Sequence, residues 1–542
     1  MLRFVCGLRH WSSRGAVKPT KKWDPRTHRE PRGNDDRSAA VTISRLRSKP
    51  TRLEEFEISK LESIIRNSEL SEKNLSLSVS LLLSPVNYSA ALAPTIGLVM
   101  DRLSSQLTLQ GVNQILGALA KLKTKRPETD ITREISEKSE IFLDFFSNKF
   151  LTDCPNRELS NISWAMHVLR LPCEAIEDTV ATRLSSFDAC DLSLVCAGLM
   201  DMPDHKLWPS IRQELLCRKR FTPKDIGSIM CSLACAGIND RELILHLASI
   251  VDRTEILQIR NLPALVWALA TCDSFHAPLL TKAQQLLKDH PEALTDALDV
   301  RRVSRGFAVT GQLAMIEVWL MERVLGESKN SQTADSLLIW ELTTNGLGDS
   351  ALKLFRSRPM AYWKGQAEVA EVNASQLYHL YLFSLLEGRS LNPDEERFLK
   401  SLESKFSCIS EDMSSSVLHR QASQAVRKLK YEHVSEYKDP ATGYIVDIYI
   451  PEINTAVEVQ GPTHFVVDLE TGAYTLRPAD MFKHRVLSKV SGIRVVQATP
   501  WNFGSKLSVK NETLMKALIE NKPVPKQKHQ GHRRPKTTSN PV

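Results

Sequence analysis

Two acidic residues stand on neighbouring predicted strands near the C-terminus of the 542-residue chain. In residues 444–450, apolar and aromatic residues alternate around Asp447, a pattern typical of a β-strand. Residues 455–460 predict a second strand, in which Glu458 and Gln460 share one face because alternate side chains of a strand point the same way. The short turn between them should lay the two strands side by side. Carboxylates on adjacent strands would by themselves suggest a nuclease.

The elements that must position these residues predict a small α/β unit. Apolar residues at helical spacing predict a helix over 478–490, and Gly492 is a plausible end signal. A third strand is predicted over 493–499. Upstream, a helix is predicted over 414–430 and a short strand just before Pro440. The order strand, turn, strand, helix, strand is typical of a small α/β unit with a short central sheet.

The chain before this unit repeats one pattern. Each of six segments begins on an apolar residue, followed by an apolar residue three positions on, a small residue six positions on and an apolar residue seven positions on. The leading residues are spaced 33 to 47 positions apart: Val112, Leu159, Leu192, Ile226, Leu262 and Val300. Weaker matches at Leu337 with Trp340 and Leu377 with Leu380 extend the predicted array over 53–400.

Repeats of this length are typical of helical hairpins, which cannot bury their apolar faces alone and therefore stack on one another. The sequence predicts a mostly α protein, in which an α-helical repeat solenoid precedes the small α/β domain. The small residue of each segment should mark where a neighbouring helix approaches closely. Amphipathic helices resemble one another, so a helical domain without true repeats is the alternative.

The two ends of the chain carry much of its net charge of +8. Residues 1–23 contain six Lys or Arg among apolar residues and no acid, which is typical of an organelle transit peptide. Residues 1–52 are therefore predicted to be transit peptide and linker, of a mitochondrial matrix protein or, as second choice, a plastid one. An ordinary basic terminus is the alternative. The terminal segment 506–542 ends in a basic tail that should be disordered and attract phosphates, or merely aid solubility.

Composition excludes several classes of protein. With 42% hydrophobic and 25% charged residues, the chain suits a soluble protein of more than one domain. It offers no run of about 18 uncharged apolar residues that would span a membrane. Its ten cysteines include no CxxC pair and no clustered histidines at zinc spacing, so neither a zinc site nor a disulfide framework is predicted.

A set of motif residues is concentrated in the α/β unit: Asp447, Glu458, Gly461, Pro462, His464, Phe465, Leu487, Gly492 and Trp501. With these residues the stretch 412–505 resembles a RAP domain, the small module named for its abundance in apicomplexan proteins. Such modules usually end organellar proteins whose preceding part is a helical-repeat array, as in the Fas-activated serine/threonine kinase family and the octotricopeptide-repeat proteins. The resemblance implies a protein that binds mitochondrial RNA, with ribosomal RNA among the candidates, and acts in RNA processing, stability, translation or mitoribosome assembly. Mitoribosomal or assembly proteins are the implied protein partners.

RAP domains are also similar in fold to very-short-patch repair endonucleases and the wider PD-(D/E)XK group. Those nucleases hold Mg²⁺ on clustered carboxylates. The resemblance thus implies Asp447 and Glu458 as metal ligands and catalytic residues, with Gln460 assisting and Glu432 or Glu436 as a third carboxylate. Gln460, however, stands where that group usually has lysine, and a neutral amide cannot stabilise developing negative charge as an ammonium does.

RNA binding is therefore predicted ahead of a Mg²⁺-dependent endoribonuclease, and no cofactor is expected unless the chain is a nuclease. A structural subunit of a mitoribosome or assembly complex is the third reading. The alternative to catalysis at Asp447 and Glu458 is that they are polar strand residues that hold turns or the loop over 461–465. The stretch 441–503 has five basic and six acidic residues, so it is not a basic patch. The candidate RNA contacts are Lys483, His484, Arg485, Lys489, His464 and Trp501. His464 alternatively pins its loop, and Trp501 alternatively closes a small core.

Overall fold

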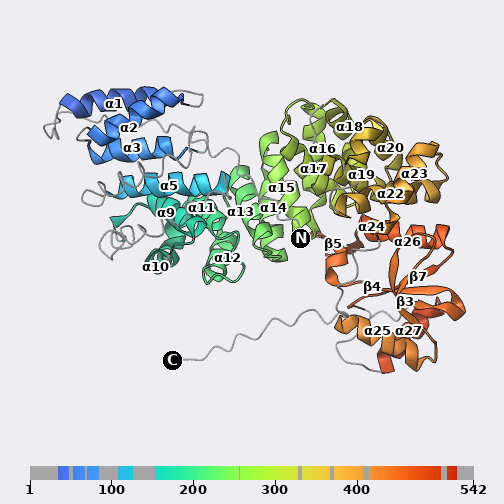
Figure 1. Cartoon of the computed structure of the whole chain (residues 1–542). Helices are drawn as coiled ribbons and strands as arrows, with labels where there is room; N and C mark the ends of the chain where they lie inside the picture. The colour runs from blue at the N-terminus through green and yellow to red at the C-terminus, as the bar shows by residue number, and fades with distance from the viewer. Residues whose placement is uncertain are drawn as a thin grey trace, which may run out of the picture. The chain divides into compact units, whose positions relative to one another are not determined.

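A computed structural model of the chain shows a mostly helical protein with a small sheet region near the C-terminus (Figure 1). To this extent the predicted fold class is confirmed. The chain divides into two compact units, Met1–Ile238 and Asn239–Val542. The structure describes residues 34–47, 53–67, 70–84, 108–125, 151, 153–171, 173–254, 257–326, 332–365, 371–406, 416–501 and 509–521. Most of the predicted transit peptide and the basic tail lie outside these residues.

The first unit is a succession of α-helices. They are α1 (Asn34–Arg47), α2 (Glu55–Asn67), α3 (Glu72–Leu82), α5 (Leu109–Lys125), α9 (Asn156–Leu169), α10 (Glu174–Arg183), α11 (Ala189–Gly198), α12 (Trp208–Cys217) and α13 (Pro223–Cys235). Helices α3, α5, α9, α11 and α13 pack each on the next in chain order. The four that carry the repeated pattern, α5 to α13, are thus consecutive neighbours in space.

Helix α1 corrects the predicted boundary of the helical region. Residues 17–52 are polar and were expected to form a linker, yet α1 occupies Asn34–Arg47. Ala39, Ile43 and Leu46 recur at helical spacing and are buried, and α1 packs on α2 and α3. A narrow apolar stripe is enough to hold a polar helix when neighbouring helices cover it.

The second unit begins with another run of helices. They are α14 (Arg241–Arg253), α15 (Leu262–Thr271), α16 (Ala277–Asp289), α17 (Ala297–Val309), α18 (Glu317–Gly326), α19 (Gln332–Thr344), α20 (Gly348–Arg356), α21 (Met360–Lys364), α22 (Glu371–Glu387), α23 (Pro393–Ser401) and α24 (Glu403–Phe406). Helices α15, α17, α19 and α22 pack each on the next, while α14 packs on α16 and α18 on α20.

Burial follows the repeated pattern closely. The leading apolar residue and those three and seven positions on are buried in all six segments. At the two sites where the small residue is glycine, it marks the close approach of a neighbouring helix. A Cβ on Gly198 would lie 3.0 Å from the Cα of Trp164 on α9, and one on Gly306 would lie 2.9 Å from the carbonyl carbon of Val266 on α15. On α19 the expected register is wrong, because the large apolar residues that are buried there are Leu338, Ile339 and Leu342, while Leu337 and Trp340 are half-buried.

The C-terminal module is built on a four-stranded sheet of order β2-β3-β4-β7. Its elements are α25 (Val417–Lys428), β2 (Val434–Lys438), β3 (Ile445–Ile450), β4 (Thr455–Val459), α26 (Pro478–Val490), β7 (Arg494–Ala498) and α27 (Val509–Ile519). Strand β3 pairs antiparallel with β2 and β4, and β4 pairs parallel with β7. Figure 1 shows α26 on one side of the sheet and α25 with α27 on the other.

Helix α27 lies beyond the predicted end of the module at residue 505. Met515 and Ile519 join a buried cluster that includes Val426 on α25 and Ile448 and Val457 on the sheet. The sheet needs this cover because alternate residues of β3 and β4 place apolar side chains on that face. The folded module therefore extends at least to residue 519.

A hairpin missed by the sequence prediction ties the module to the helices before it. Strands β5 (Phe465–Asp468) and β6 (Tyr474–Leu476) pair with each other, and β5 pairs parallel with β1 (Ser274–Phe275), which follows α15. Val466 packs in a buried cluster with Ala270 and Val309, on α15 and α17. The module and this end of the helical run consequently share one core within the second unit.

Candidate functional site

The predicted acidic residues Asp447 and Glu458 lie on adjacent strands, on the side of the sheet that α26 covers. The register pairs Ile448 with Val457, which places Asp447 across from Glu458. An Asp447 carboxylate oxygen accepts a hydrogen bond of 2.7 Å from the backbone N–H of Val459. Part of this carboxylate is therefore committed to holding β3 against the end of β4.

Glu458 forms an ion pair with Lys483 on α26. The distance from Lys483 Nζ to Glu458 Oε2 is 2.7 Å, and the two side chains are only 19% and 4% exposed. Burial raises the pKa of Glu458; the ammonium of Lys483 opposes this effect and Asp447 adds to it. The other carboxylate oxygen, Oε1, is buried without a hydrogen-bond partner among the described residues. Lys483, predicted as a phosphate contact, is thus turned toward the sheet.

His484 bridges two glutamines on the same face of the sheet. Its Nε2 lies 3.4 Å from the side-chain nitrogen of Gln460, and its Nδ1 lies 3.2 Å from that of Gln497 on β7. Burial, helped by Lys483, lowers the pKa of His484 to about 4, so the ring is neutral at pH 7. Both facing atoms are amide nitrogens, which donate, and a neutral imidazole can accept at only one of its nitrogens, so His484 accepts a hydrogen bond from only one of the two glutamines.

Gln497 was absent from the predicted site, although the alternation of residues along β7 indicates which face of the sheet it occupies. Gln497 lies beside Glu458 in the parallel register of β4 and β7. Alternation along β7 would have placed it on the site face once the strand order was known. Asp447, Glu458, Gln460, Lys483, His484 and Gln497 therefore form one polar centre under α26, which we call the buried centre.

His464 lies at the edge of the buried centre and holds a loop. Its Nδ1 is 3.0 Å from an oxygen of Asp480, in the first turn of α26. This hydrogen bond raises the pKa of His464, against the effect of burial. The geometry matches the loop-pinning role, and the side chain remains partly exposed.

Arg485 and Lys489 point away from the buried centre. Arg485 forms an ion pair with Glu387 on α22, so this side chain also joins α26 to the helical run. Lys489 is exposed one turn further along the helix. Of the four predicted contacts on α26, two face the sheet and two face outward.

Trp501 packs against the hairpin instead of standing free. Its ring centre lies 4.7 Å from that of Phe465 and 4.3 Å from that of Tyr474. Tyr474 is 42% exposed, and the guanidinium of Arg241, at the start of α14, lies 4.7 Å from its ring centre. We call Arg241, Phe465, Tyr474 and Trp501 the aromatic platform.

The suggested third carboxylate is not gathered into the buried centre. The pairing of β2 with β3 on either side of Glu436 places this residue opposite Asp447, but Glu436 is exposed and its backbone is left-handed, with φ of 53°. Glu432 is exposed before β2. A left-handed residue interrupts the pairing of an edge strand.

The residues implied as Mg²⁺ ligands supply the oxygen atoms that this ion prefers, but their surroundings are unsuitable for it. Mg²⁺ takes oxygen ligands and keeps several bound waters. One oxygen of Asp447 already accepts from Val459, one oxygen of Glu458 is paired with Lys483, and Glu458 is almost wholly buried. This closed arrangement does not fit a hydrated divalent cation.

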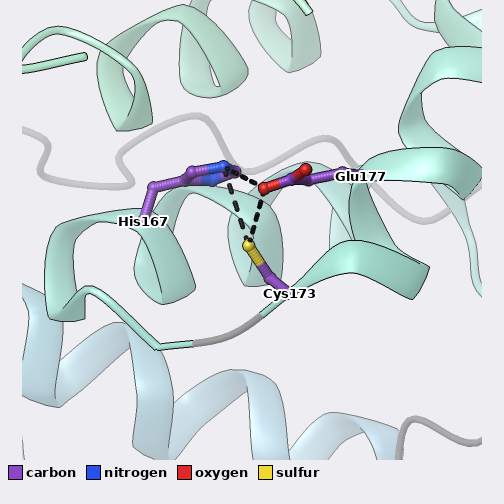
Figure 2. A group of neighbouring side chains, drawn as sticks. All are labelled: His167, Cys173 and Glu177. Carbon is purple, nitrogen blue, oxygen red and sulfur yellow. Dashed lines mark hydrogen bonds and ion pairs between the residues drawn. The ribbon is translucent and has the colours of Figure 1, made fainter. Parts of the chain in front are cut away.

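A second group of reactive side chains lies in the first unit (Figure 2). His167, Cys173 and Glu177 bring an imidazole nitrogen, a thiol sulfur and a carboxylate oxygen within 4.8 Å of one another. Burial lowers the pKa of His167 and raises that of the Cys173 thiol. Burial acts to raise the pKa of Glu177, but hydrogen bonds from Cys173, His205 and Lys206 outweigh it and lower the pKa to about 2. The sequence prediction sought paired cysteines and so missed one cysteine between a histidine and a glutamate.

The chain matches no family model and no curated protein with which it was compared. Within the described residues, every helix is too short or too polar to cross a lipid bilayer. The expectation of no membrane span is confirmed for that part of the chain.

Proposed function

We propose that the chain is a mitochondrial RNA-binding protein that acts in organellar RNA processing, RNA stability or mitoribosome assembly. In this proposal the two helical runs are arrays of an α-helical repeat solenoid, and the C-terminal module is a RAP domain with a PD-(D/E)XK-like fold that contacts RNA. The motif residues of the module, the basic leader and the repeated helices support it.

The aromatic platform is the observation that carries the proposal. Unstacked RNA bases bind on aromatic rings and on arginine guanidinium planes. Tyr474 presents a half-exposed ring with Trp501 beside it and Arg241 over it, so groups from the hairpin and from α14 meet at one place. Lys489 adds an exposed cation on α26, and phosphate contacts of this type supply affinity without sequence preference.

Binding of single-stranded mitochondrial RNA to the full-length protein tests the proposal. Fluorescence anisotropy at low salt should show an affinity that falls as salt rises. Tyr474→Ala should weaken it by roughly 5- to 150-fold, because stacking contributes about 1–3 kcal/mol per base. Arg253→Gln is the matched control for Arg241→Gln, since Arg253 is an exposed arginine at the other end of α14.

Two results would count against the proposal. Wild-type affinity in both Tyr474→Ala and Arg241→Gln would remove the aromatic platform as the binding site. The absence of RNA affinity at low salt would instead favour a structural subunit of a mitoribosome or assembly complex, held by protein contacts.

A Mg²⁺-dependent ribonuclease is the second candidate; it requires Lys483 to leave Glu458 so that the closed arrangement described above can open to a hydrated ion, and one observation favours it. Lys483 places an ammonium 2.7 Å from Glu458, and so supplies from α26 the positive charge that Gln460 lacks. The same RNA is incubated with Mg²⁺ and the wild-type protein and, in separate reactions, with Mg²⁺ and the Asp447→Asn or the Glu458→Gln variant. Cleavage by wild type that both substitutions abolish would make the chain an enzyme; intact RNA would leave binding as the function.

A further inference from the structure

The side chains of His167, Cys173 and Glu177 converge at the junction of α9 and α10 (Figure 2). The Cys173 sulfur lies 3.7 Å from His167 Nε2 and 3.2 Å from Glu177 Oε1, and the latter two atoms are 3.3 Å apart. Zinc in a tetrahedral site has bonds of about 2.0–2.3 Å, which place its ligand atoms about 3.3–3.6 Å apart. The shortest and longest of the three separations, 3.2 Å and 3.7 Å, depart from this range by only about 0.1 Å, so the three atoms are spaced nearly as ligands of one tetrahedral ion.

The thiol proton of Cys173 can serve only one of the two atoms that its sulfur faces. His167 Nδ1 lies 2.7 Å from the backbone carbonyl oxygen of Ser163, which can only accept, so Nδ1 carries the ring proton. The Nε2 atom faces both the Cys173 sulfur and a carboxylate oxygen of Glu177. The single thiol proton of Cys173 can be donated to His167 or to Glu177, not to both. A bound cation would satisfy all three atoms.

Neighbouring residues orient the three side chains by hydrogen bonds, as the residues around a metal site orient its ligands. Metal-binding histidines usually donate their second ring N–H to a carbonyl or carboxylate, as His167 donates to Ser163. The Glu177 carboxylate is held by His205 Nε2 at 3.1 Å and by Lys206 Nζ at 3.2 Å. His205 Nδ1 accepts from the backbone N–H of Leu207, so its Nε2 carries the proton and donates to Glu177.

We propose that His167, Cys173 and Glu177 form a zinc site with three protein ligands and a fourth position for water, in which His205 positions the Glu177 carboxylate. Mixed nitrogen, sulfur and oxygen ligands suit Zn²⁺ better than Mg²⁺ or Ca²⁺, which take oxygen. The ion replaces the thiol proton and joins the C-terminal end of α9 to the N-terminal end of α10. The site lies in the first unit and does not depend on the proposed RNA function.

The test uses the full-length protein, stripped with a chelator and titrated with Zn²⁺ against a chromophoric indicator. One equivalent should bind, and Co²⁺ in its place should give the charge-transfer absorption of a thiolate–cobalt bond. Cys173→Ser and Glu177→Gln should lose at least tenfold in zinc affinity, and Cys173→Ser should also lose the cobalt band. Cys217→Ser, which alters an exposed thiol on α12, is the matched control and should keep both signals.

Thermal unfolding separates metal binding from folding defects. Zinc should raise the melting temperature of wild type and of Cys217→Ser but not that of Glu177→Gln, and His205→Gln should still bind one zinc ion with lower affinity. Absence of a zinc-dependent shift in wild type together with no bound equivalent would overturn the proposal and leave a hydrogen-bonded cluster only. Wild-type zinc affinity in Cys173→Ser would overturn it equally.

Discussion

Replacing Lys483 by methionine should destabilise the C-terminal module in a way that depends on pH. Glu458 is 4% exposed and would lose the ammonium 2.7 Å from its carboxylate. A carboxylate left unpaired in such a site takes up a proton instead of staying charged. The pKa of Glu458 is already raised by burial, and removal of Lys483 would raise it further.

The free energy of that proton uptake sets the size of the effect. Each pH unit between the solution pH and the ordinary glutamate pKa of 4.5 corresponds to about 1.36 kcal/mol. Because the wild-type pKa of Glu458 is itself raised, these figures are upper limits: the penalty of Lys483→Met should be at most about 3 kcal/mol at pH 7, at most about 2 kcal/mol at pH 6 and under about 1 kcal/mol at pH 5. The sign of the effect follows because the pKa of Glu458 is higher in the folded state than in the unfolded state, so the protonated carboxyl favours folding. This stabilisation is fully present below the unfolded-state pKa and is lost as the pH rises through the folded-state pKa.

Urea unfolding at pH 5, 6 and 7 measures this penalty, with hydrogen exchange of peptides from β4 and α26 to assign the transition to the module. Lys489→Met is the matched control on the same helix and should cost less than about 0.5 kcal/mol at every pH, since its side chain is exposed. The double change Glu458→Gln with Lys483→Met should recover most of the loss. A penalty independent of pH, or no larger than that of Lys489→Met, would refute the reasoning.

Three further predictions concern the fold. Gly306→Ala should cost about 1–3 kcal/mol in urea unfolding because its Cβ would lie 2.9 Å from Val266, whereas Gly117→Ala, with no atom within 4 Å, should stabilise by up to about 1 kcal/mol. Deletion of residues 507–542 should unfold the module by circular dichroism and hydrogen exchange because it removes α27, while deletion of 522–542 should not. Val466→Ala should cost about 1–2 kcal/mol and speed hydrogen exchange at β1, and Val417→Ala, at an exposed site, should do neither.

Local periodicity was enough to predict the main elements of the module. Alternation in residues 444–450 and 455–460 gave β3 and β4, and helical spacing gave α26 with the observed ends, Pro478–Val490. These patterns depend only on neighbouring residues, because one buried face imposes a period of two on a strand and of 3.6 on a helix. The buried faces of the six repeated segments were predictable for the same reason.

Contacts between distant residues were not predictable in this way. The basic cluster at Lys483 to Lys489 has the sequence of a solvated helix face, and only the rotation of α26 on the sheet decides that Lys483 meets Glu458. Strand β1 has only two residues, so no apolar alternation predicts it, and its pairing with β5 depends on the tertiary fold. The group at His167 likewise depends on how the chain turns between α9 and α10.

The pairing of β5 with β1 has a consequence for how the chain folds during synthesis. The ribosome releases α15, β1 and α17 before β5 is synthesised, so the edge of β1 and the side chains of Ala270 and Val309 remain without their cover until then. Domains generally fold as units in the order in which they emerge, and uncovered apolar surface promotes aggregation until it is buried. A chain terminated anywhere before Phe465 would therefore lose more than the module, because the helices that precede it would be left permanently without their last layer.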